Sequence, residues 1–165
     1  MATSADPKGN YQLSRDGDLT GLETGKFDLI LSAFAFDNIP DIAKRSDLLA
    51  GLQRLLRDGG RILLLGSTRD NYLHEWVSFT TRDFPRNRHA LSGDTVRIVM
   101  KDVEDKRPIL DLVWFHEDYL HLFARSELDL IAHYTPLGRE TEPYKWQTKT
   151  SIAPWFIYVL GKNVG

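Results

Sequence analysis

The chain has 165 residues, of which 42% are hydrophobic and 27% charged, and its net charge is −2. These values are typical of one soluble globular domain, and the charge gives no general attraction to nucleic acid or acidic membranes. The chain has no cysteine, which excludes disulfides, thiolate metal sites and cysteine nucleophiles. Because residues 1–8 are polar and no apolar run approaches membrane-spanning length, we expect a cytoplasmic protein without membrane contacts.

The segment before residue 27 is predicted to contain one short strand and a turn. Residues 10–14 have the composition of a strand, and residues 15–18, which contain Asp16 and Gly17, favour a tight turn. Residues 20–26 are predicted to be a loop. Aspartate and glycine are most often plain turn formers, so this turn alone indicates no binding site.

Residues 27–67 have the pattern of a βαβ unit. Residues 27–32 form a nearly continuous apolar run, which is typical of a strand buried on both faces of a parallel sheet. Residues 41–58 place leucines at helical spacing, and Gly59-Gly60 predicts the helix end because glycine adopts the left-handed conformation at little cost. Residues 61–67 are predicted to be a second buried strand. We therefore expect two parallel strands with a right-handed crossover.

The parallel pattern ends after residue 67, and shorter elements follow. Alternating apolar and polar residues predict strands, and an acidic first turn favours a helix start. The predicted elements are, in chain order, a helix over 71–80, the two strands of a β-hairpin over 96–100 and 110–114, a helix over 117–125, and strands over 128–134 and 155–160.

The order and spacing of four segments resemble class I S-adenosylmethionine (SAM)-dependent methyltransferases. The segments are residues 16–19, 27–32, 55–62 and 155–159. The resemblance implies an α/β fold: a partial Rossmann-like methyltransferase sheet, mostly parallel, with an antiparallel last strand and an added β-hairpin cap. It also implies a single domain over residues 1–165, corresponding to the C-terminal two thirds of a methyltransferase domain.

The resemblance implies which residues contact the cofactor SAM. Asp16 matches the acidic position that accepts a hydrogen bond from the adenine amino group, and Gly17 matches its neighbour. Ser32 and Ala33 match positions that line the sulfonium and methionine portion, and Phe34 is expected beside them. In open α/β sheets, ligands bind at the carboxyl ends of the strands, which agrees with this placement.

The resemblance places a small-molecule substrate beyond this strand and under the hairpin cap. The substrate-binding candidates are Phe36, Asp37, Trp76, Trp114, Tyr119 and Trp146. Aromatic residues are more often plain core, so these assignments depend on the resemblance. Basic residues near Trp76, Phe79 and Phe84 could also form a surface for an anionic substrate or nucleic acid; they are Arg69, Arg82, Arg86, Arg88 and His89. Nearby acidic residues dilute this charge, so a solvated lid is the favoured interpretation.

No catalytic residue is identified by the sequence. His74, His116 and His133 are general-base candidates because imidazole titrates near neutral pH, but neither spacing nor context selects one. Many methyl transfers need only proximity and alignment. His116 and His121 are five residues apart, whereas histidines of zinc-binding helices are four apart, so we expect no metal.

Two motifs of the family have no counterpart in the sequence: the glycine-rich turn after the first strand, and the acidic residue that binds the ribose hydroxyls. Fewer than ten residues precede the first predicted strand. Without the neighbouring strands, residues 27–32 would have an unpaired edge, which favours association with another chain. We expect either that residues 10–14 lie beside this edge or that two chains pair there as a homodimer.

Three functions remain open. The leading hypothesis is methyl transfer from SAM to a small molecule, and the missing motifs leave open whether this chain is active alone. The alternative is a non-catalytic methyltransferase-like remnant that acts through dimer or partner contacts. A third hypothesis is another doubly wound nucleotide binder, such as a dehydrogenase fragment, because glycine-stopped βαβ units are shared among such folds.

Overall fold

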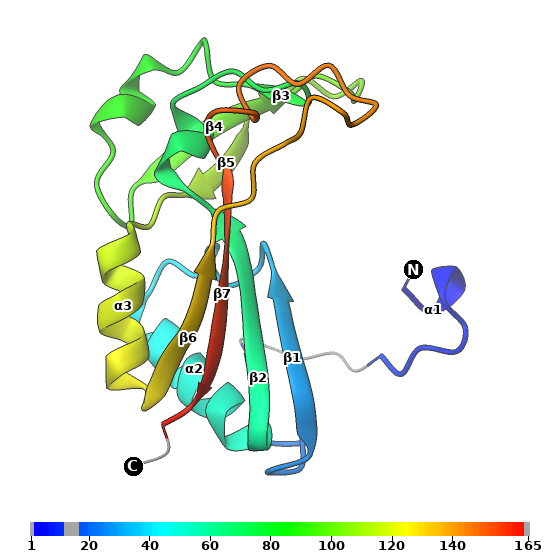
Figure 1. The fold of residues 1–165 in the computed structure, drawn as a ribbon, viewed down its shortest axis with the longest axis vertical. Helices are drawn as coiled ribbons and strands as arrows, with labels where there is room; N and C mark the ends of the chain where they lie inside the picture. The colour runs from blue at the N-terminus through cyan, green and yellow to red at the C-terminus, as the bar shows by residue number, and fades with distance from the viewer. Residues whose placement is uncertain (1, 12–16, 164–165) are drawn as a thin grey trace.

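Two sheets lie end to end in the computed structural model, which describes residues 2–11 and 17–163 (Figure 1). The strands of the larger sheet are, in spatial order, β1 (Phe27–Ala33), β2 (Leu56–Ser67), β7 (Trp155–Lys162) and β6 (Leu128–Tyr134). β1 and β2 are parallel to each other, whereas β7 is antiparallel to both of its neighbours, β2 and β6. The predicted antiparallel last strand is therefore confirmed.

The smaller sheet is antiparallel and forms a cap beyond the larger one. Its strands are β3 (Phe79–Thr80), β4 (Thr95–Met100) and β5 (Ile109–Leu112), in that order. Val96 and Ile98 of β4 are buried under this sheet, as their alternation in the sequence predicts. The predicted β-hairpin is confirmed as β4 and β5, and with it the predicted fold class.

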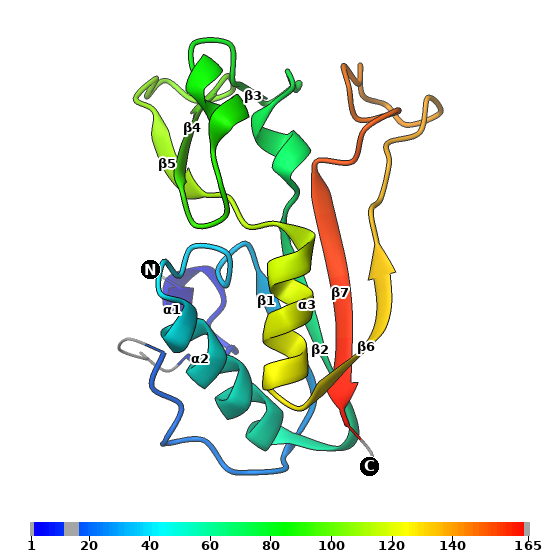
Figure 2. The same cartoon turned by 90° about the vertical axis from the view of Figure 1, so that its left-hand side faces the viewer.

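The longer helices lie on one face of the larger sheet, as Figure 2 shows. Residues of β2 and β7 alternate between this face and the opposite one, and those facing the helices form the main core with leucines of α2 and aromatic residues of α3. The helical segments are α1 (Ala2–Ala5), α2 (Ile42–Leu55), α3 (His116–Arg125) and the 3₁₀ helices η1 (Arg69–Tyr72) and η2 (Pro85–His89). None of these described helices is long and apolar enough to cross a membrane.

The predicted end of the first long helix is wrong. α2 ends at Leu55, and Gly59 and Gly60 lie within β2 instead of capping the helix. The chain becomes extended at Leu56, which pairs with Phe27, and the register then shifts before Leu29 pairs with Arg61. Gly59 has a φ of +77°, and a Cβ on Gly60 would lie 2.9 Å from the carbonyl oxygen of Phe27. Glycine at position 59 thus allows the positive φ, and glycine at position 60 allows the close approach of β1, at the bulged start of β2.

The helix predicted over residues 71–80 is also wrong. Side chains in this segment bond to nearby groups and compete with helical hydrogen bonds. The Trp76 indole donates to the carbonyl oxygen of Asn71 at 2.8 Å, and the Glu75 carboxylate accepts from the amide of Thr81 at 2.9 Å. Only η1 and the short β3 form there, although Tyr72 and Trp76 are buried as an apolar face would require.

β1 is not buried on both faces, contrary to the prediction for residues 27–32. The side chains of Leu29 and Leu31 are 56% and 61% exposed. Among the described strands, β1 pairs with β2 alone, so its other edge is open as expected. Residues 12–14 of the segment predicted to lie beside this edge fall outside the described residues.

Candidate functional site

The carboxyl ends of β1, β2 and β6 meet at one edge of the larger sheet. The strand pairing places Ala33 beside Leu65, and His133 beside Tyr158 of the antiparallel β7. α3 begins at the same edge, where the chain returns from the smaller sheet (Figure 1). Side chains from four separate parts of the sequence therefore converge here.

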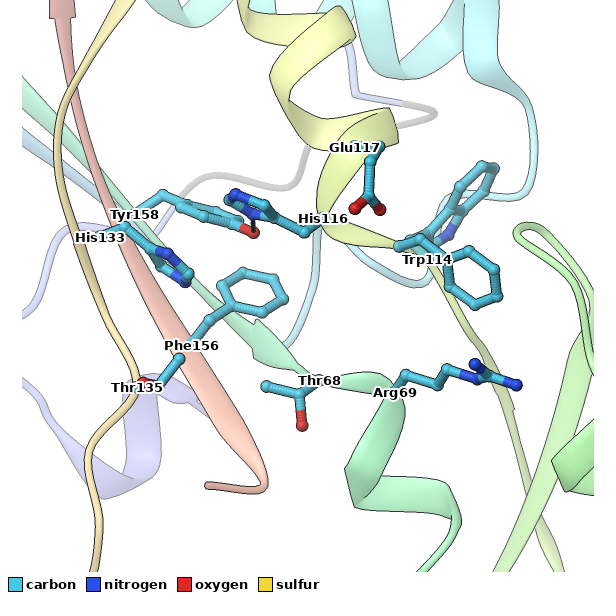
Figure 3. A pocket seen from close by; sticks show the side chains of 10 residues that line it. Thr68, Arg69, Trp114, His116, Glu117, His133, Thr135, Phe156 and Tyr158 are labelled. Carbon is cyan, nitrogen blue, oxygen red and sulfur yellow. Dashed lines mark hydrogen bonds between the residues drawn. The ribbon is translucent and has the colours of Figure 1, made fainter. Parts of the chain in front are cut away.

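A cavity of about 260 Å³ opens at this edge. Aromatic rings form most of its wall, and two histidines and an arginine supply polar groups (Figure 3). Its lining residues are Thr68, Arg69, Trp114, Phe115, His116, Glu117, His133, Thr135, Phe156 and Tyr158. A small, mostly apolar cavity with a few convergent polar groups is typical of a ligand site.

His116, His133 and Tyr158 form the polar part of the cavity wall. His116 Nδ1 lies 2.6 Å from the Tyr158 hydroxyl oxygen. Burial raises the pKa of Tyr158, so its hydroxyl stays protonated, and the tautomer of His116 decides which of the two groups donates this hydrogen bond. The His133 ring stacks on His116 with ring centroids 4.8 Å apart, and it lies 4.7 Å from the Tyr158 ring.

His133 is neutral at neutral pH. Burial lowers the pKa of His133, and the neighbouring His116 lowers it further. The ring lines the cavity, so its nitrogens lie where a bound ligand could reach them (Figure 3). A neutral imidazole beside a ligand can accept a proton from it.

A positive charge and the start of a helix also border the cavity. The guanidinium of Arg69 lies 5.2 Å from the Phe115 ring centroid and donates to the carbonyl oxygen of Arg88 at 3.1 Å. α3 begins at His116, and its N-cap residue Phe115 provides no side-chain cap for the first peptide N–H groups. Arg69 and the positive end of the helix dipole supply positive charge here, and the carboxylate of Glu117 in the first turn of α3 supplies negative charge, so both favour a polar group of a ligand.

The predicted cofactor residues at the end of β1 lie along the same edge. Phe34 has a φ of 51°, so the chain turns sharply directly after β1, and its amide donates to the carbonyl oxygen of Leu65 at 2.9 Å. The Phe34 ring is 43% exposed and contacts the edge of the Trp155 ring at 5.8 Å. With Ser32 and Ala33, it forms a wall at the carboxyl end of β1.

The predicted adenine-side residues do not extend this wall in the described part of the chain. Gly17 has a φ of +76° and lies beside Leu48 of α2, whereas Ser32, Ala33 and Phe34 lie at the end of β1. Asp16 lies outside the described residues. The role of this turn in binding adenine remains a prediction.

Four of the predicted substrate residues are brought together, but around a buried arginine. Arg45 is 1% exposed, and its guanidinium lies 3.9 Å from the Trp114 ring centroid and 4.7 Å from those of Phe36 and Tyr119. The Trp114 indole donates to the carbonyl oxygen of Asp37 at 2.9 Å. Phe36, Asp37 and Tyr119 are interior, and Trp114 alone of the four also lines the cavity.

Burial shifts the charged pair in this cluster in opposite directions. It raises the pKa of Asp37 and lowers the pKa of Arg45, because burial disfavours both charged forms. Oδ2 of Asp37 accepts from the amide of Ser67 at 3.2 Å, whereas Oδ1 of Asp37 and two guanidinium nitrogens of Arg45 have no hydrogen-bond partner among the described residues. Such atoms are satisfied in proteins by ordered water.

The two remaining predicted substrate residues lie away from the cavity. Trp76 is buried under the smaller sheet, and Trp146 belongs to the long segment before β7. Together with Trp155 they line a narrow hollow of about 30 Å³, too small for a substrate. The Trp146 indole donates to Glu142 at 2.7 Å, and Lys149 lies 4.5 Å from its ring centroid.

The structure distinguishes the histidines that the sequence could not. His74 lies near Asp70, with 3.8 Å between Nε2 and Oδ1, and contacts Trp76 away from the cavity. Residues 2–11 and 17–163 contain no group of three His, Cys, Asp or Glu side chains placed to hold a metal ion. The sequence did not indicate Tyr158 or Thr68, and it indicated Arg69 only as part of a basic surface. Only the pairing of β6 with β7 and of β7 with β2 brings these residues beside the histidines.

No family model and no curated protein matches the sequence. Solved structures do match. A putative SAM-dependent methyltransferase from Listeria monocytogenes is 12% identical, with a TM-score of 0.66 over 98% of this chain and 75% of that one. One from Mesorhizobium loti is 13% identical, with a TM-score of 0.64 over 96% and 73% of the two chains.

Two further matches show that this chain spans only part of the length of the methyltransferases it resembles. The SAM-dependent methyltransferase from Methanosarcina mazei is 14% identical, with a TM-score of 0.59, and the match covers 93% of this chain but 67% of the other. The Leishmania major methyltransferase is 17% identical with a TM-score of 0.58, and this chain spans 49% of it. At these identities the likeness establishes the fold and not the activity. The chain has the fold of class I SAM-dependent methyltransferases.

Proposed function

We propose that the chain contributes to SAM-dependent methyl transfer to a small molecule that binds in the cavity beside His116, His133 and Tyr158. One observation carries the proposal: this cavity and the wall formed by Ser32, Ala33 and Phe34 lie along the same edge of the sheet. The carboxyl ends of the strands are the general ligand-binding position in open α/β sheets.

The end of β1 fits one side of the cofactor. Ser32 offers a hydroxyl, and Phe34 offers an exposed ring against which an adenosyl or thioether group can pack. Among the described residues, no strand on the open side of β1 supplies an opposite wall. SAM, when bound, supplies the electrophilic methyl group.

The cavity favours a small and largely flat acceptor. Its volume of about 260 Å³ lies near the lower limit of ordinary ligand pockets, and Trp114, Phe115 and Phe156 present ring surfaces. His133, whose pKa is lowered by partial desolvation and by His116, is positioned to accept a proton from a hydroxyl or amine of the acceptor. Tyr158 fixes the orientation of His116 through its hydrogen bond to Nδ1.

Calorimetric titration with S-adenosylhomocysteine tests this function. We expect saturable binding with a Kd below about 1 mM, and we expect Phe34→Ala to weaken it about fivefold to tenfold because an aromatic contact contributes about 1 kcal/mol. Leu110→Ala is the matched control, since Leu110 is 61% exposed on β5 of the smaller sheet and should leave the affinity unchanged. The absence of heat with the wild-type chain at millimolar ligand would exclude the function for this chain.

A second candidate function is partner binding without catalysis. The observation that favours it is the exposure of apolar side chains on β1, next to a strand edge without a described partner. Exposed apolar surface of this kind marks interaction sites. Binding of S-adenosylhomocysteine separates the two candidates, because a remnant that acts only through partner contacts would not bind it.

A further inference from the structure

The outer edge of β1 lacks the features that protect natural edge strands. β1 has seven residues, contains no proline and carries a single charge, Asp28, which forms an ion pair with Arg57 of β2. Edge strands in natural proteins are very short, or carry proline, bulges or charges that hinder pairing, and the one charge of β1 is neutralised by Arg57. The outer edge of β1, with which no described strand pairs, is therefore suited to accept another strand.

The apolar side chains of β1 lie on the face of the sheet opposite the helices. Ile62 and Leu64 of β2 are buried against α2 and α3, and their neighbours Leu63 and Leu65 face the other way. The described helices α2 and α3 lie on one face only (Figure 2). Leu29 and Leu31 are consequently in contact with water although both are aliphatic.

We propose that β1 pairs antiparallel with β1 of a second copy of this chain, across a two-fold axis at Ile30. The sequence of β1 is complementary to itself in this register. Leu29 lies opposite Leu31 of the second copy, and Asp28 lies opposite Ser32, so apolar side chains meet and no two carboxylates face each other. A two-fold interface requires this property, because the same surface is used by both copies.

The pairing supplies the outward backbone groups of β1 with partners and partly covers Leu29 and Leu31 on the open face. The contact is limited to one strand from each copy, which places it among the smaller protein interfaces. We therefore expect a dimer with a Kd that is roughly micromolar. The inference does not depend on methyl transfer, because no cofactor or acceptor takes part in the contact.

Cysteine cross-linking tests the register, and the chain is suited to it because it has no native cysteine. Directly opposed residues of an antiparallel pair have Cα atoms about 4.5 to 5.5 Å apart, within the range of a disulfide. Ile30→Cys should therefore form a disulfide dimer rapidly under mild oxidation. Leu29→Cys places the two sulfurs on diagonal positions about 7 to 8 Å apart and should cross-link at least tenfold more slowly. Leu110→Cys controls for cross-linking by random collision, because Leu110 is about as exposed as Leu29 but lies on the smaller sheet.

Light scattering at about 100 μM, well above the expected Kd, tests the dimer without cross-linking. The wild type should be dimeric and Leu31→Lys monomeric, because two lysines would then flank the axis; Leu110→Lys should remain dimeric. Far-ultraviolet circular dichroism checks that both exposed-site variants are folded. A monomeric wild type at this concentration would overturn the proposal. A dimer that survives Leu31→Lys, or that cross-links equally through Leu29→Cys and Ile30→Cys, would also overturn it.

Discussion

His133 is the cavity residue whose chemistry depends most on its surroundings. Its ring contacts the rings of His116 and Tyr158, which desolvate it in part and place a second imidazole close by. Both effects disfavour the imidazolium form. The result is a neutral base at neutral pH in a cavity that also contains a cationic side chain, Arg69.

A histidine titration by NMR should show this directly. We expect the midpoint for His133 to lie below the ordinary value of 6.5, and we expect His116→Ala to raise it only in part, because burial is the larger cause. A midpoint at or above 6.5 in the wild type would contradict the structure of the cavity.

The same shift predicts how stability depends on pH. Below the ordinary value of 6.5 the unfolded chain binds a proton at His133 more readily than the folded chain. The contribution of His133 to the free energy of unfolding is therefore complete above pH 6.5. It is lost as the pH falls toward the pKa of His133 in the folded chain. The sequence offered His133 as one of three candidate bases, and only the pairing of β6 with β7 selects it.

Other single residues show why sequence prediction of the site was partial. Phe36, Asp37, Trp114 and Tyr119 were expected beside the substrate, and they do lie together. Arg45, which was not singled out, occupies their centre, so most of this group is interior. A sequence pattern shows that aromatic residues will be buried, but it does not show which of them will border a cavity.

Among the elements, α2 has the best-defined start. Asp41 has extended backbone geometry, and its carboxylate accepts from the amides of Ala43 at 2.7 Å and Lys44 at 3.1 Å. This is the arrangement of a side-chain N-cap, which satisfies otherwise free amides in the first turn. The predicted helix start at residue 41 was therefore accurate, whereas its end depended on pairing with β1.

Removal of this cap should destabilise the fold. We expect Asp41→Ala to lower the free energy of unfolding by about 1 kcal/mol in chemical denaturation, because two amides lose their acceptor. Asp47→Ala is the matched control: Asp47 lies exposed within α2 and caps no described amide. Equal effects of the two substitutions would show that the loss of an acidic residue, and not of the cap, is responsible.

Local sequence predicted most strands but not their irregularities. β4, β5, β6, β7 and α3 occur where alternation and the acidic helix start indicated. The bulge at the start of β2 and the irregular segment after η1 did not follow from local pattern. Both arise from contacts that are distant in sequence or specific to side chains, such as Gly60 against Phe27 and Trp76 against Asn71.

For the whole molecule, the order β1, β2, β7, β6 connects fold and function. It places the ends of β1, β2 and β6 at one edge, so the wall at Phe34 and the cavity at His133 belong to a single surface. The chain spans 67% of the Methanosarcina mazei structure and 75% of that from Listeria monocytogenes. The open edge of β1 borders the wall at Phe34, so any strand that pairs there lies beside the proposed cofactor position.

The central claim, that this edge binds the methyl donor, is tested most directly by NMR mapping of S-adenosylhomocysteine on the isotope-labelled chain. We predict that amide shifts change first at Ser32, Ala33 and Phe34 and then around the cavity at Thr68 and His116. Shift changes at the opposite end of the sheet, near Leu56 and Lys162, or no changes at millimolar ligand, would contradict the claim.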